Sequence, residues 1–303
     1  MIKLLLLSGF LGAGKTTLMT HILDTYANEK VGMIINEFGA TGVDGPLLAR
    51  NEVVMEELNN GSIFCACIKG NFLQSLIEMS KKNISHLFIE PTGIADPSEM
   101  QQLLDTIAGK LHTPYDYRGV ICVVDAETFP KLSKVLPTLT RQVEYCAAAI
   151  INKADLVSQE RIGEVTELVQ GLNPSCEIIV TSYSRFDIRA LEERMSPVTI
   201  AAKDSTNTPE VRPVSYVLKP QGDVPVEALR TFVETLLPHA YRIKGFLPSG
   251  GKEIVVSAVG GVINIEDWTG ENPQHGLVII SAIGISIMSR ITEALGDELQ
   301  LKL

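Results

Sequence analysis

The chain has 303 residues, of which 45% are hydrophobic and 20% charged, and a formal net charge of −10 at pH 7. This composition excludes wholesale disorder and allows one large domain or a medium domain with a smaller one. The acidic balance argues against nucleic acid as a partner, because a phosphate backbone is bound by clustered Lys and Arg. The five cysteines are too few and odd in number for a disulfide framework, and they fit a reducing compartment.

The first apolar run, Ile2–Ser8, is short and is followed by glycines, so we expect a buried strand there rather than a signal peptide. No stretch of the sequence is long enough to span a bilayer. These features predict a soluble, cytoplasmic protein without a membrane partner.

Short apolar runs alternate with segments of helical periodicity over the first 200 residues. The runs are rich in Val, Ile and Leu without clean alternation, which is typical of strands covered on both faces. The pattern predicts an α/β fold with a mostly parallel sheet flanked by helices. The expected strands are Ile2–Ser8, Lys30–Asn36, His86–Glu90, Gly119–Asp125, Ala147–Asn152 and Glu177–Thr181.

The composition changes after this region. Residues 201–213 are polar and lack periodicity, which predicts a linker between a domain at 1–200 and a small α+β domain at 214–303. In the small domain we expect a strand at Val214–Lys219, a helix at Val226–Leu237, three or four strands between Ala240 and Ala282, and a last helix at Ser286–Leu295.

A glycine-rich segment, Gly9–Thr16, matches the pattern G-x-x-x-x-G-K-[ST] between a predicted strand and a predicted helix. Its backbone N–H groups and the helix N-terminus suit phosphate oxygens, Lys15 suits the β- and γ-phosphates, and the Thr16 hydroxyl suits Mg²⁺. The alternative is an ordinary glycine-rich turn before a helix. The predicted phosphate-binding residues are Gly9, Gly12, Ala13, Gly14, Lys15, Thr16 and Thr17.

The segment Asn152–Asp155 has the N-K-x-D pattern at the end of a predicted strand. A carboxylate at Asp155 can accept both donors on one edge of guanine, whereas adenine offers no such pair. Asn152 can bond the other side of the ring or hold the loop in place, and the Lys153 stem can lie over the base. Thr181, after the last strand, can complete the pocket. The alternative is a turn that caps the next helix, but with the phosphate loop the pattern favours GTP over ATP.

Acidic and glycine residues follow two further strands. Glu90 ends an apolar run, where an acid near a phosphate loop faces Mg²⁺ or the attacking water, and the N–H of Gly93 can contact the γ-phosphate. Glu37 lies in a glycine-rich loop, Asn36–Gly45, that we expect near the metal and phosphates; an ordinary surface loop is the alternative. Because no residue stands out as the group that positions water, we expect hydrolysis to be slow without a partner.

Cys65 and Cys67 are one residue apart and can point the same way in an extended segment. Two thiolates, with Glu37 as a further ligand, could bind a soft metal such as Zn²⁺. The spacing alone favours buried, inert thiols. The remaining cysteines, Cys122, Cys146 and Cys176, lie in apolar runs and are predicted to be core residues.

Together these motifs resemble the CobW-like GTPases, a group that includes UreG and HypB and serves metalloenzyme maturation. The resemblance implies that Lys15, Glu37 and Glu90 act in catalysis, that Thr16 and Glu90 hold Mg²⁺, and that Glu37, Cys65 and Cys67 bind Zn²⁺ or Co²⁺. The sequence departs from the family's GCICC pattern, since it reads GSIFCAC. The segments that carry the resemblance are GFLGAGKTT at Gly9–Thr17, INEFGATGVDG at Ile35–Gly45, EPTGIADP at Glu90–Pro97, NKADL at Asn152–Leu156, and Arg242–Phe246 with Val259–Gly261 in the small domain.

The resemblance implies a P-loop GTPase with GTP, GDP and Mg²⁺ as ligands, which acts as a metallochaperone or in maturation of a cobalamin-type enzyme. The client is then a metalloenzyme or corrinoid protein, and the small domain holds it or a second subunit of a homodimer. An alternative is a GTP-dependent conformational activator that carries no metal. A small-molecule kinase is a third possibility, against which the N-K-x-D segment argues.

Overall fold

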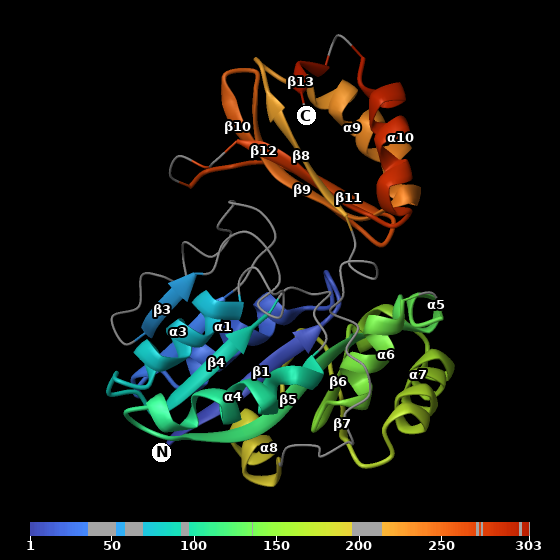
Figure 1. The fold of residues 1–303 in the computed structure, drawn as a ribbon. Coiled ribbons are helices and arrows are strands. Elements are labelled where there is room, and N and C mark those ends of the chain that lie inside the picture. Colours follow the sequence, from blue (N-terminus) through green and yellow to red (C-terminus); the bar gives the residue numbers. More distant parts are fainter. Residues whose placement is uncertain are drawn as a thin grey trace. The chain divides into compact units, whose positions relative to one another are not determined.

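The fold of this chain consists of two compact units, one up to residue 195 and the other from residue 214 (Figure 1). A computed structural model describes residues 1–35, 53–57, 69–91, 97–134, 136–195, 214–270, 273, 275–296 and 299–302. The predicted linker at 201–213 lies outside the described residues.

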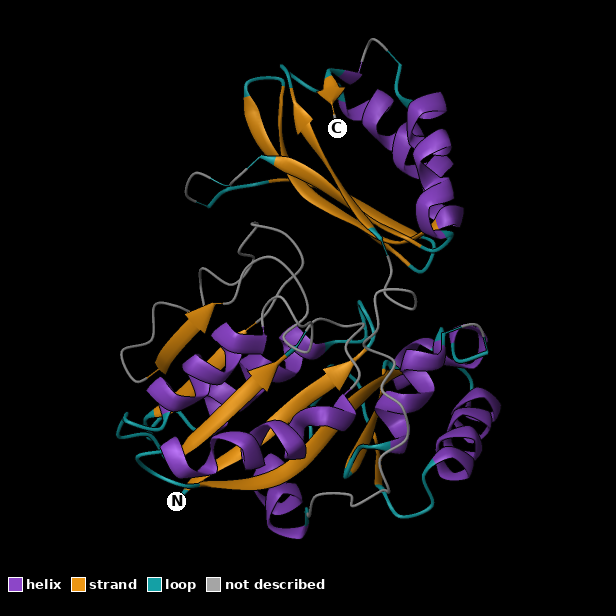
Figure 2. Ribbon diagram, in the orientation of Figure 1, coloured by secondary structure: helices purple, strands orange, loops and turns teal. Residues whose placement is uncertain are grey.

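The first unit is built on a seven-stranded sheet in the order β3-β2-β4-β1-β5-β6-β7. Every pairing in it is parallel. An all-parallel sheet needs cover on both faces, and helices flank it accordingly (Figure 2). The strands are β1 (Ile2–Gly9), β2 (Val31–Ile35), β3 (Val53–Glu57), β4 (His86–Glu90), β5 (Tyr115–Asp125), β6 (Ala148–Asn152) and β7 (Glu177–Val180).

The core explains the uninterrupted apolar runs. Leu5 and Leu7 pack in one cluster with side chains of α1 and α8. Leu4 and Leu6 are also fully buried, and they point to the opposite face because side chains alternate along a strand. The helices of this unit are α1 (Lys15–Thr25), α3 (Lys69–Met79), α4 (Met100–Ile107), α5 (Phe129–Leu132), α6 (Pro137–Glu144), α7 (Gln159–Leu172) and α8 (Ile188–Arg194).

The α/β fold class predicted from the sequence is confirmed, with one strand missed. The six expected strands all form, with ends shifted by a few residues. The sequence analysis did not identify β3, whose five residues end in two glutamates and lie at the sheet edge. An edge strand needs less apolar surface than a central strand, so its pattern is weak.

The strand order places the ends of three strands together. β1 lies between β4 and β5, and the chain moves from β1 to one side of the sheet through β2 and β3 before it turns back and passes β1 to reach β5 on the other side. Ligands of open α/β sheets bind at such a reversal, beyond the carboxyl ends of the strands. The loop after β1, Glu90 at the end of β4 and Asp125 at the end of β5 therefore share one edge, which we call the carboxyl edge.

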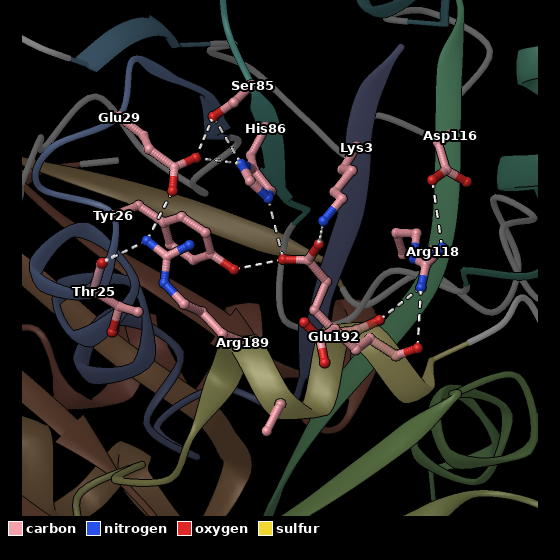
Figure 3. Close-up of polar contacts among 12 residues, drawn as sticks. Lys3, Thr25, Tyr26, Glu29, Ser85, His86, Asp116, Arg118, Arg189 and Glu192 are labelled. Carbon is pink, nitrogen blue, oxygen red and sulfur yellow. Dashed lines mark hydrogen bonds and ion pairs between the residues drawn. The ribbon is translucent and has the colours of Figure 1, made fainter.

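The opposite edge of the same sheet, the amino edge, is closed by polar and charged groups around a buried acid (Figure 3). The carboxylate of Glu192 on α8 is 3% exposed and accepts a hydrogen bond of 2.5 Å from the Tyr26 hydroxyl. It also lies 2.5 Å from the ammonium of Lys3 and 3.1 Å from the ring of His86. One acid thus joins the starts of β1 and β4 to the end of α1.

A second acid, Glu29, extends this cluster. Its carboxylate lies 3.3 Å from His86 and 2.8 Å from Arg189 of α8. The Arg189 guanidinium lies over the Tyr26 ring, 4.3 Å from its centroid. The buried charge of Glu192 is tolerated because it lies beside the Lys3 ammonium and accepts a hydrogen bond from Tyr26. The amino-edge cluster, Lys3, Tyr26, Glu29, His86, Arg189 and Glu192, therefore fastens α8 to the sheet.

The second unit is a six-stranded antiparallel sheet in the order β11-β10-β9-β12-β8-β13 with two helices. Apolar residues of both helices join alternate strand residues in one core. Four strands lie between Ala240 and Ser281, as the sequence predicts; the two-residue β13 was not expected. Its elements are β8 (Ser215–Pro220), α9 (Val226–Leu236), β9 (Ala240–Ser249), β10 (Lys252–Val259), β11 (Val262–Asp267), β12 (Gly276–Ser281), α10 (Ile287–Ala294) and β13 (Leu301–Lys302).

Candidate nucleotide-binding site

The loop between β1 and α1 has a shape that only glycine can supply at two positions. Gly9 has φ 136°, and a Cβ there would lie 2.4 Å from the carbonyl oxygen of Val123. Gly14 has φ 113°, and a Cβ there would lie 2.3 Å from Nδ2 of Asn152. Both conformations are costly for other residues. The two glycines of the sequence pattern thus bring the loop against β5 and against the end of β6.

The N-terminus of α1 offers backbone donors at the carboxyl edge. Gly14 is its N-cap, and within the described residues no side chain caps this end and no acid lies in its first turn. Thr16 and Thr17, in that turn, are exposed. The first N–H groups of a helix have no partner inside the helix and carry partial positive charge. This end of α1 can therefore bind an anion such as a phosphate.

Lys15 lies folded against its own loop. Its ammonium donates to the carbonyls of Gly9 and Phe10, at 2.9 and 3.2 Å. It also lies 3.9 Å from Oε1 of Glu90, and the side chain is 7% exposed. The structure thus brings together two residues that lie 75 positions apart in the sequence and that the motifs assign to one site.

Asn152 links the phosphate loop to the loop after β7. Its Nδ2 donates to the carbonyl of Ala13 at 2.9 Å, and its Oδ1 accepts from the backbone N–H of Ser184 at 2.9 Å. The side chain is 3% exposed. Of the two roles considered for Asn152 from the sequence, these contacts correspond to holding the loops together, because both ends of the amide are engaged within the protein.

Lys153 is fixed by an acid that the sequence analysis did not assign. Its φ is 62°, a left-handed conformation that is uncommon outside glycine. Its ammonium donates to Oδ2 of Asp125 at 2.6 Å. Oδ1 of Asp125 accepts from the backbone N–H groups of Glu127 and Thr128, at 2.9 and 3.2 Å. The available sequence signal was an acid at the end of an apolar strand, the same signal that singled out Glu90.

The loop after β7 lies beside Asp155. The Ser182 hydroxyl accepts from the backbone N–H of Asp155 at 3.1 Å, and the Asp155 residue is exposed. The Thr181 hydroxyl donates to the carbonyl of Arg185 at 2.6 Å, which closes this loop on itself. Thr181 therefore shapes the loop, while the exposed carboxylate of Asp155 is free to face a ligand.

Four of the predicted site residues, Glu37, Cys65, Cys67 and Gly93, lie outside the described residues. In the part of the chain that the structure does describe, no group of three or more His, Cys, Asp or Glu side chains could hold a metal ion. The prediction that the other three cysteines are core residues is confirmed, since Cys122, Cys146 and Cys176 are free and buried. Burial raises the pKa of the Cys122 thiol to about 12, so it stays protonated at neutral pH.

The strand order, the glycine loop and the uncapped N-terminus of α1 define the first unit as a P-loop nucleotide-binding domain. Residues 3–180 match the model of the CobW/HypB/UreG nucleotide-binding domain. Residues 214–299 match the cobalamin synthesis protein CobW C-terminal domain. The chain belongs to the CobW/HypB/UreG family, as its motifs predict.

Curated relatives match part of the chain. The zinc-regulated GTPase metalloprotein activator 1 of Schizosaccharomyces pombe is 31% identical over 191 residues, which are 60% of this chain and 46% of that protein. The zinc chaperone YjiA of Escherichia coli is 31% identical over 195 residues, which are 63% of this chain and 60% of that protein. The match thus spans about half the length of these relatives.

Among solved structures, the Zn(II)-bound YjiA GTPase from E. coli aligns with 97% of this chain and 99% of its own, at 20% identity and a TM-score of 0.48. This similarity is too low to support a family assignment, which rests on the matches to the two family models. Within the described residues, no helix has the length and apolar character needed to cross a membrane.

Proposed function

We propose that this protein binds and hydrolyses GTP and uses its nucleotide state to control delivery of a transition metal to a client protein. The observation that carries the proposal is the position of Asn152, which joins the phosphate loop at Ala13 to the loop after β7 at Ser184. A triphosphate on one loop and a base beside the other belong to one ligand, so a rigid link between the two loops supports a nucleotide site.

The phosphates bind at the N-terminus of α1 and along the backbone of Gly9, Gly12, Ala13 and Gly14. Lys15 leaves the carbonyls of its own loop and donates to the β- and γ-phosphate oxygens, which are stronger acceptors because they are charged. Thr17 contacts an inner phosphate. This arrangement is supported by the exposed first turn of α1, in which no acid would repel the phosphates.

Thr16 and Glu90 offer hard oxygen donors, the type that Mg²⁺ prefers. The 3.9 Å separation between Glu90 and the Lys15 ammonium supports this fit, because it puts the carboxylate beside the phosphate loop. These two residues would hold Mg²⁺, which on binding neutralises charge on the transferring phosphoryl oxygens.

Asp155 selects guanine by accepting from its ring N–H and its exocyclic amine. Lys153, held by Asp125, lies with its stem over the base. Thr181 supports this pocket through the loop that its hydroxyl closes. An adenine base would leave the Asp155 carboxylate without these donors, which disfavours ATP.

Hydrolysis is slow without a partner in this proposal. Of the two predicted catalytic acids, Glu90 lies within the described residues and Glu37 outside them. Glu90 lies beside the Lys15 ammonium. Further groups, such as side chains of a client protein, then complete the catalytic site. Gly93 contributes an N–H to the γ-phosphate.

The proposed metal function is supported by the family and by two relatives, a zinc-regulated GTPase metalloprotein activator and a zinc chaperone. We assign the metal to Cys65, Cys67 and Glu37, with Zn²⁺ or Co²⁺ as cargo and a metalloenzyme or corrinoid protein as client. The second unit then holds the client or another copy of this chain. Because linkage is reciprocal, the metal affinity must differ between the GTP-bound and GDP-bound forms.

Calorimetric titration with GTP, GDP and ATP in the presence of Mg²⁺ tests the nucleotide assignment. We expect at least a hundredfold preference for guanine nucleotides, in the range that unpaired polar groups impose on a wrong ligand. In the Asp155→Asn variant the preference moves to xanthosine triphosphate, because an amide N–H can donate to the carbonyl that xanthine has at that position. Equal binding of GTP and ATP by the unaltered protein would refute the assignment.

Zn²⁺ and Co²⁺ titration in the GDP-bound form and with a non-hydrolysable GTP analogue tests the metal assignment. We expect different affinities in the two forms, and loss of tight binding when Cys65 and Cys67 are both replaced by Ser. Equal affinities would remove the metal-delivery mechanism. Client activation that survives the double replacement would instead favour the conformational activator.

A further inference from the structure

The backbone is strained at the two loops beside the predicted base. Among the described residues, four non-glycine residues have positive φ, and three of them are Lys153, Tyr183 and Ser184. A left-handed conformation costs such residues roughly 1–2 kcal/mol each. Strain of this kind persists where the surroundings or a ligand require it. Tyr183 and Ser184 are consecutive, at φ 56° and 53°, so the loop after β7 turns sharply at these two residues.

Ser184 has a structural reason for its conformation. It is fully buried, its N–H donates to Asn152, and its hydroxyl donates to the carbonyl of Gly14 at 3.3 Å. Tyr183 has no such reason. Its side chain is 66% exposed and makes no hydrogen bond, ion pair or ring contact with any part of the chain that the structure describes. A large ring is thus held out in solvent on a strained backbone.

The Tyr183 ring lies at a pocket that begins at the phosphate end of α1. This pocket has a volume of about 330 Å³ and is lined on one side by Thr16, Thr17 and further residues of α1. Tyr183 and Arg185 line its other side. A nucleotide whose phosphates bind at the first turn of α1 must extend its sugar and base away from that turn. One end of this pocket therefore lies beside the predicted phosphate site, within reach of a nucleoside that extends from it.

We propose that the ring of Tyr183 packs against the nucleoside of a bound purine nucleoside di- or triphosphate and covers it from solvent. This proposal rests on the proposed nucleotide function and adds a residue to its site. Aromatic stacking acts on the face of any base, whereas Asp155 acts on the edge of guanine. Tyr183 accordingly contributes to affinity for guanine nucleotides without contributing to the choice between bases.

The substitutions Tyr183→Gly and Tyr183→Phe test this role. Glycine removes the ring and also suits the left-handed backbone, so the free protein should melt at the same temperature or higher. Stacking of about 1–3 kcal/mol per base predicts that Tyr183→Gly weakens GDP and GTP binding by about tenfold. Tyr183→Phe keeps the ring and should bind within about twofold of the unaltered protein. Tripolyphosphate with Mg²⁺, which has no nucleoside, should bind all three proteins equally.

Two results would overturn the proposal. One is GDP binding by Tyr183→Gly that equals that of the unaltered protein. The other is a lower melting temperature of Tyr183→Gly together with an equal loss of affinity for GDP and for tripolyphosphate. Tyr183 would then only maintain the shape of the loop. If the unaltered protein itself binds no guanine nucleotide, the proposed function fails instead, so the two failures are distinguishable.

Discussion

The two edges of the parallel sheet use polar groups in opposite ways. At the carboxyl edge, the loops after β1, β6 and β7 leave backbone N–H groups and exposed side chains directed outward, and the strained residues cluster there. At the amino edge, Glu192, Tyr26 and His86 are buried and lie against each other (Figure 3). β1, β4 and α1 therefore each have one end suited to a ligand and one end that fixes the fold.

The largest change in stability is expected when Glu192, at the centre of the amino-edge cluster, is replaced. Glu192→Ala leaves the Tyr26 hydroxyl and the His86 ring buried without their acceptor. Breaking a buried ion pair lowers the free energy of unfolding by roughly 3–5 kcal/mol. We expect a loss of about 3 kcal/mol, because the Lys3 side chain is 43% exposed and its ammonium stays hydrated. Urea unfolding measures it. Glu193→Ala, at the exposed neighbouring position, is the control and should change stability by less than about 0.5 kcal/mol.

If both substitutions destabilise equally, the amino-edge cluster does not fix the fold. If Glu192→Ala folds and retains its affinity for GDP, the two edges act independently, as the comparison implies.

Acid should weaken the same cluster. Burial by itself raises the pKa of Glu192, but the His86 ring, the Lys3 ammonium and the Tyr26 hydroxyl around it lower the pKa to about 2. The unfolded chain, with a pKa near 4.5, therefore takes up a proton first as the pH falls. This contribution to stability is complete above about pH 5, and about 2 kcal/mol of it is lost by pH 3. Urea midpoints of the unaltered protein and Glu192→Gln, measured over this range, isolate it as their difference; parallel pH profiles would contradict it.

At the carboxyl edge, Asn152 should affect stability and ligand binding together. Asn152→Ala removes two buried hydrogen bonds and should lower the free energy of unfolding by about 1–2 kcal/mol. GTP and GDP affinity should fall together, because the two loops lose their link. Asn152→Asp keeps the acceptor for Ser184 and loses the donor to Ala13, so it separates the two contacts. A stable Asn152→Ala protein with no GTP affinity would mean that Asn152 contacts the ligand directly.

The smallest effect is expected at Lys153, whose replacement should change GTP affinity much more than stability. If its stem covers the base, Lys153→Ala should weaken GTP binding by about tenfold, as loss of one stacking contact does. Lys153→Met keeps most of the stem and should lose less. Unfolding should change by less than about 1 kcal/mol, since Asp125 keeps its two backbone donors. A larger loss of stability than of affinity would place Lys153 among the residues that fix the fold.

Much of the carboxyl edge could be predicted from the sequence, because local patterns encode it. Gly9–Thr16 and Asn152–Asp155 are each short and contiguous, and each follows a strand that its apolar run reveals. Asp125 and Tyr183 were not assigned. Asp125 is one acid among many in the sequence, and only the pairing of β5 with β6 brings it to Lys153. The exposure and strain of Tyr183 have no sequence signature.

The amino-edge cluster could not be predicted at all. Lys3, Tyr26, His86 and Glu192 come from four elements, and no periodicity connects them. In the sequence, Glu192 resembles any acid on an amphipathic helix, as its exposed neighbour Glu193 does. Its burial depends on where α8 packs.

The sequence by itself determined the fold class and the glycine loop of this protein and located the N-K-x-D segment at a strand end, because strands, glycine turns and strand-end motifs are set by residues close together in the chain. The tertiary structure alone decided which distant side chains meet, as Lys15 meets Glu90 and Asn152 joins two loops. The physical reason is that burial and charge pairing depend on distance in space, which the order of parallel strands sets and local sequence does not.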